Sequence, residues 1–159
     1  MTDFGKVREF VALLRFLRPG LLLLVALGIF RIIIGAIGVP ESIGNWISSG
    51  TMLAMVLAIY YGYSAPSHGF NRYWQALLIG WSISAIENLM VTAGILITPA
   101  LGLAHYSSFT SVHVGIIQHA VNHLWSVFFG SDVALLLLIL VSIGFLFGRC
   151  KPALKRQSA

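Results

Sequence analysis

The chain has 159 residues, of which 58% are apolar and only 9% are charged. A soluble domain carries roughly 25% charged residues, so this composition excludes a fully solvated surface and predicts an integral membrane protein. At roughly 20 apolar residues per spanning helix, the length allows four spans and no separate soluble catalytic domain.

Four apolar runs predict a single all-α domain over residues 1–159 that crosses the membrane four times. The predicted spans are 20–39, 44–63, 73–97 and 131–148. Tyrosines and tryptophans at several span ends, such as Trp46 and Tyr63, match the aromatic belt found at headgroup level.

Residues 110–128, between the third and fourth spans, predict an additional, amphipathic helix. Polar and small residues gather on one side, and apolar residues fill the other. The pattern predicts a helix that lies in the outer interface or is docked over the mouth of the bundle. A re-entrant or spanning fifth element is the alternative.

The basic residues predict the orientation of the chain. Of ten lysines and arginines, nine lie in the N-terminus, the loop after the second span, or the C-terminus, and Arg31 lies within a span. Cytoplasmic loops carry this excess. We therefore expect a multi-pass protein of the cell (inner or plasma) membrane with both termini in the cytoplasm. The net charge of +5 reflects orientation and attraction to anionic lipid, so no nucleic-acid partner is predicted.

Two ionisable residues lie inside predicted spans. Arg31 and Glu87 belong to spans that both run outward, and their positions place them within about one helical turn in depth. An unpaired charge there costs at least ~2.5 to 3.5 kcal/mol, which a mutual ion pair would offset, with Asn88 adding a hydrogen bond. The pair is either a substrate, proton or ion site, or a structural contact that fixes helix packing or meets a partner subunit.

The histidines offer a candidate metal site on the outer side. His119 and His123 are four residues apart, the spacing that places two ligands on one helical face. Possible further ligands are Glu41, His105 and Asp132, and such a set could bind a transition metal or a haem. The alternative is that these histidines belong to a polar helix face exposed to water. His113 falls on the apolar side of the predicted helix, opposite His119 and His123, and is expected to be a packed, hydrogen-bonded core residue.

Three functions remain open on this basis. The short chain lacks a complete catalytic set, which favours a non-catalytic, accessory subunit of a larger membrane complex, with the bilayer and other membrane subunits as partners. A metal- or haem-binding membrane redox protein using His119 and His123 is the first alternative. A small transporter with a site at Arg31 and Glu87 is the second. An enzyme is not the expected class.

Overall fold

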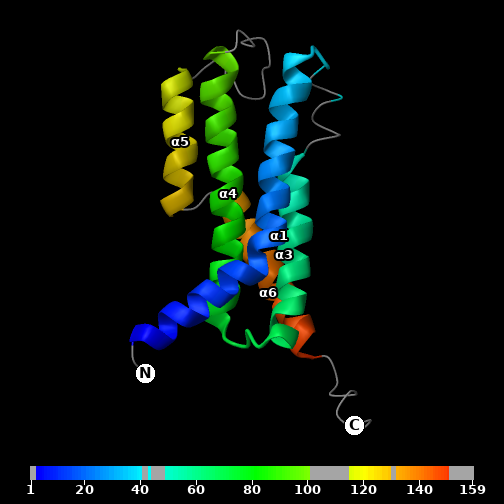
Figure 1. Ribbon diagram of the computed structural model, residues 1–159, viewed down its shortest axis with the longest axis vertical. Coiled ribbons are helices and arrows are strands. Elements are labelled where there is room, and N and C mark those ends of the chain that lie inside the picture. The colour runs from blue at the N-terminus through cyan, green and yellow to red at the C-terminus, as the bar shows by residue number, and fades with distance from the viewer. Residues whose placement is uncertain (1–2, 41–42, 44–48, 101–114, 130–131, 151–159) are drawn as a thin grey trace.

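The computed structural model describes residues 3–40, 43, 49–100, 115–129 and 132–150. Every regular element in these ranges is a helix, as the sequence predicts. In chain order they are α1 (Asp3–Ala36), α3 (Gly50–Ser64), the short 3-10 helix η1 (Ala65–His68), α4 (Tyr73–Ala100), α5 (Ile116–Phe129) and α6 (Asp132–Arg149), as Figure 1 shows.

Three helical stretches of the described chain are long and apolar enough to cross a membrane. They are Val7–Ala36, Tyr73–Ile97 and Ile116–Arg149, and the last includes both α5 and α6. The described part of the second predicted span is α3, which has 15 residues; residues 44–48 of that span lie outside the described ranges. Length and composition thus support the class of membrane protein that the sequence predicts.

Helix α1 is longer than the predicted first span because it continues through Pro19 to Asp3. Figure 1 shows the N-terminal part of α1 leaving the bundle at an angle; residues 3–18, which precede Pro19, are called the arm below. A proline inside a helix removes one backbone hydrogen bond and kinks the helix. Tyr61 of α3 compensates at this kink: its hydroxyl accepts from the Gly20 amide at 2.9 Å and donates to the Leu17 carbonyl at 3.4 Å.

The arm is fixed under the bundle by packing on the α3–α4 connection. Leu13 and Leu17 are buried. The Phe16 ring lies 5.0 Å from Tyr61 and 5.2 Å from Phe70, measured between ring centroids. The arm therefore belongs to the folded bundle.

Helices α3 and α6 approach closely through small residues. Ala54, Ala58 and Gly62 repeat every fourth position on α3 and are buried. Gly144 and Gly148 present the same spacing on α6: a Cβ at Gly144 would lie 2.6 Å from the Ile59 carbonyl oxygen, and one at Gly148 would meet the Tyr63 backbone. Such small residues let helix backbones pack together where lipid offers no hydrophobic drive.

Helix α5 runs lengthwise beside α4 (Figure 1), whereas the sequence predicted a helix in the outer interface or over the mouth of the bundle. Ala120 packs in a cluster with Ile95, and Trp81 donates its indole N–H to the Val127 carbonyl at 3.0 Å. Trp81 and Ile95 are about 21 Å apart along α4, at 1.5 Å per residue. Helix α5 therefore packs along the side of α4; residues 110–114 of the predicted helix lie outside the described ranges.

The described basic side chains other than Arg31 gather at one end of the bundle. Arg72 pairs with Glu9 of the arm at 3.5 Å, and the Arg149 guanidinium lies 5.4 Å from the centre of the Tyr73 ring. The arm carries the others. Basic residues from three distant parts of the sequence therefore share one end, as the charge distribution predicts.

Candidate functional site

One helix supplies the buried polar side chains of the described chain. All six of them belong to α4: Gln75, Ser82, Ser84, Glu87, Asn88 and Thr92. Because hydrocarbon offers no hydrogen bonds, polar groups of a membrane bundle turn towards its interior. Helix α4 therefore forms the polar centre of the molecule, and its neighbours determine what each polar side can bind.

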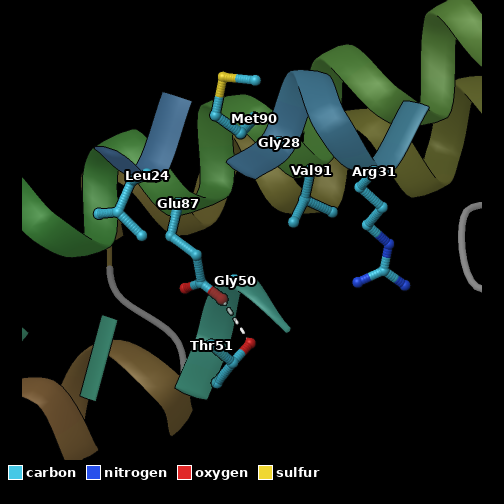
Figure 2. A pocket seen from close by; sticks show the side chains of 8 residues that line it. All are labelled: Leu24, Gly28, Arg31, Gly50, Thr51, Glu87, Met90 and Val91. Carbon is cyan, nitrogen blue, oxygen red and sulfur yellow. Dashed lines mark hydrogen bonds between the residues drawn. The ribbon is translucent and has the colours of Figure 1, made fainter. Parts of the chain in front are cut away.

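The Glu87 side chain is only 8% exposed and points towards the start of α3. There the Thr51 hydroxyl donates a hydrogen bond to the carboxylate at 2.6 Å (Figure 2). Ser49 caps α3, since its hydroxyl accepts from the Met52 amide at 3.3 Å. A helix N-terminus carries partial positive charge and unpaired N–H groups, and the Glu87 carboxylate lies beside this end of α3.

Arg31 lines the same pocket as Glu87. The pocket has a volume of about 60 Å³, and the remaining walls come from α1, α3 and α4: Leu24, Gly28, Gly50, Thr51, Met90 and Val91. Figure 2 shows the guanidinium and the carboxylate extending from different helices with space between them. Among the described residues the ion pair joins Arg72 and Glu9, not Arg31 and Glu87.

The predicted pair is thus neighbouring but not in direct contact. Gly28 sits beside Met90, where an added Cβ would be 2.5 Å from the Met90 methyl carbon, so α1 and α4 are close one turn below Arg31. Arg31 lies beyond Val91 in the pocket (Figure 2), while Thr51 takes the position next to the carboxylate that Arg31 was predicted to occupy. The sequence did carry a signal for Thr51, because Ser49 is a favoured N-cap residue and places Thr51 in the first helical turn.

Asn88, the next residue along α4, faces α5 and does not line the Glu87 pocket. Its amide Nδ2 donates to the Ser84 carbonyl at 3.0 Å. Its Oδ1 lies 3.2 Å from His123 Nδ1 of α5, so His123 Nδ1 carries the proton and Nε2 is left as the acceptor in the neutral ring. Consecutive residues of α4 thus face two separate polar sites.

His119 and His123 lie together, with ring centroids 5.0 Å apart. The described residues bring no third histidine, cysteine, aspartate or glutamate to them. Asp132 is exposed at the start of α6, and Glu41, His105 and His113 lie outside the described ranges. The structure therefore provides two adjacent imidazoles with one proton fixed by Asn88.

Comparisons of the chain with protein-family models, with curated proteins and with solved structures found no match. The fold and the site define a helical membrane protein with a buried glutamate and an arginine around one small pocket.

Proposed function

We propose that this chain is a small proton-coupled membrane transporter in which Glu87 binds the proton. The observation that carries the proposal is the Glu87 carboxylate, buried yet open to a pocket that Arg31 also lines. An ionisable side chain in the middle of a membrane helix is expensive and usually marks an ion or proton pathway. A pair that only fixed packing would be expected to close into direct contact.

The volume of the pocket limits what it can carry besides a proton. The pocket of about 60 Å³ holds only a few water-sized groups, which favours a small inorganic ion over a metabolite.

Proton flux into liposomes tests this proposal. The purified chain is reconstituted with a pH-sensitive dye inside, and an inward proton gradient is applied in chloride. We expect acidification above that of protein-free liposomes, a loss of it in Glu87→Gln, and retention of it in the control Glu9→Gln, whose carboxylate pairs with Arg72. Flux in Glu87→Gln equal to wild type, in protein that elutes as a monodisperse peak, contradicts the proposal.

An accessory subunit of a membrane complex is a second candidate, favoured by the free face of α5. Gln118 and Asn122 are exposed and bond to each other at 3.2 Å, beside the exposed apolar side chains Ile117, Val121 and Phe128. Polar side chains on a membrane helix commonly bond across to another helix. If a partner covers this face, a complex isolated in mild detergent should lose mass in Gln118→Ala/Asn122→Ala and keep it in the control Leu135→Ala, which alters an exposed apolar side chain of α6 instead.

The membrane topology is part of the same proposal. We propose four crossings, by α1, by the segment that ends in α3, by α4, and by α5 and α6 acting in series, with both termini in the cytoplasm of a cell membrane. The clustering of Arg72, Arg149 and the arm at one end supports it. Metal or haem binding at His119 and His123 stays a prediction from the sequence.

A further inference from the structure

A groove lies in the angle between the arm and the rest of α1. It has a volume of about 420 Å³. Most of its walls are apolar and come from both sides of Pro19 and from α4: Val11, Leu14, Leu21, Leu22, Val25 and Ile86. Because Leu22 is 56% exposed and Val11 47% exposed, the groove is open along its apolar side.

Two arginines give this groove a charged end. Arg15 and Arg18 line it from the arm, and both are exposed. The nearby described carboxylate, Glu9, is bonded to Arg72 and is not part of the groove. The groove is therefore apolar along its length and positively charged at one end, where the arm meets the rest of α1.

We propose that the groove binds one anionic phospholipid. Its acyl chain lies along the apolar walls, and its phosphate is held by Arg15 and Arg18. Guanidinium groups bind phosphate with paired, charge-assisted hydrogen bonds, and basic pockets beside membrane helices select anionic headgroups. A soluble anion would leave the apolar walls unfilled, whereas a phospholipid matches both parts. This proposal is independent of the Glu87 pocket.

Native mass spectrometry of the purified chain with phosphatidylglycerol tests the proposal. We expect one retained phosphatidylglycerol per chain and weaker retention of phosphatidylcholine. Each basic side chain near an anionic surface contributes about a fivefold gain in affinity, so Arg15→Gln/Arg18→Gln should weaken phosphatidylglycerol binding roughly 30-fold. Arg8→Gln is the matched control, since Arg8 is on the same arm but does not line the groove; it should change binding little.

A second variant separates the acyl groove from surface charge. Leu22→Trp fills the groove and leaves both arginines in place, so it should reduce the retention of both phosphatidylglycerol and phosphatidylcholine. Equal binding by wild type and Arg15→Gln/Arg18→Gln, or an equal loss in Arg8→Gln, overturns the proposal in favour of diffuse attraction. Should the variants fail to fold, competition for labelled phosphatidylglycerol on the wild type decides. Displacement by phosphatidylcholine as strong as that by unlabelled phosphatidylglycerol contradicts a site selective for anionic phospholipid. Displacement by inorganic phosphate at millimolar concentration contradicts it as well.

Discussion

At the scale of single residues, the Thr51–Glu87 hydrogen bond is the contact on which the pocket depends. The hydroxyl donates to a carboxylate at 2.6 Å, in a setting where water does not compete freely. The bond joins α3 to α4, 36 positions apart in sequence. Thr51 thus both positions the carboxylate and ties the two helices together.

Replacing Thr51 with valine tests that role without changing the shape of the side chain. Loss of the charge-assisted bond should lower the free energy of unfolding by about 1–2 kcal/mol, measured by denaturant titration in detergent. Thr51→Ser keeps the hydroxyl and should retain most of the stability. If Thr51→Val were as stable as wild type, the bond would not form in the membrane-embedded protein.

The two histidines of α5 should respond differently to alanine. His123 bonds to Asn88, so His123→Ala leaves a buried amide oxygen unsatisfied and should cost about 1 kcal/mol. His119 has no such bond to α4, and His119→Ala should be close to neutral. Unfolding in detergent measures both.

The same variants test the predicted metal site. Elemental analysis of the purified protein should then show metal lost from both His119→Ala and His123→Ala and kept in His113→Ala, because two imidazoles must act together. Metal content unaffected by either substitution would leave His123 a structural residue.

At the scale of the elements, the α3–α6 contact depends on missing side chains. An alanine at Gly144 must push against the Ile59 carbonyl oxygen, a backbone atom that cannot turn aside. Overpacking of this kind typically costs about 1–3 kcal/mol, so Gly144→Ala should destabilise by that amount. Gly50→Ala is the control, since a Cβ there meets nothing within 4 Å. A Gly144→Ala variant as stable as the control would show that α3 and α6 do not touch there.

The position of α5 can be checked with the lone cysteine. After Cys150→Ser, a cysteine is introduced at Ile117 or at Phe128, which are 76% and 68% exposed, and intact cells are treated with a membrane-impermeant maleimide. If α5 dips beside α4, Phe128→Cys should be protected and Ile117→Cys labelled. Labelling of both positions would favour a helix that lies on the outer surface.

Several elements followed from the sequence because local signals decide them. The run of apolar residues placed the third span at 73–97, and α4 is Tyr73–Ala100; the last predicted span, 131–148, corresponds to α6, Asp132–Arg149. The arm was not predicted, because Pro19 reads as a helix start unless another residue satisfies the freed backbone groups. Here the Tyr61 hydroxyl of α3 satisfies them, because it accepts from the Gly20 amide and donates to the Leu17 carbonyl.

The contacts between elements were harder to predict. Amphipathicity shows that α5 has an apolar side, but not which surface covers it, and the same pattern suits an interface helix and a helix beside α4. Similarly, Arg31 and Glu87 were placed at comparable depth from sequence, yet depth alone does not determine the direction of two long side chains. Thr51 comes within hydrogen-bonding distance of Glu87 only because α3 packs on α4, and the sequence does not show that packing.

At the scale of the whole molecule, the gathering of basic residues at one end should be visible as topology. Reporter fusions after Ser67 and after Gln157 should both report the cytoplasm, and a fusion after Leu103 should report the outside. The reason is the preference of lysine and arginine for the cytoplasmic side. An external C-terminus would require an odd number of crossings and would refute the four-span proposal.

The Glu9–Arg72 pair also sets an order of assembly during synthesis. Its two residues are 63 positions apart, and the aromatic partners of Phe16, Tyr61 and Phe70, follow it by 45 and 54 positions. At about 5–20 residues per second, the ribosome delivers the docking surface of the arm roughly 3–13 s after the arm itself. During that interval the residues that pack against the arm do not yet exist, so the arm can reach its final position only after the α3–α4 connection has been made.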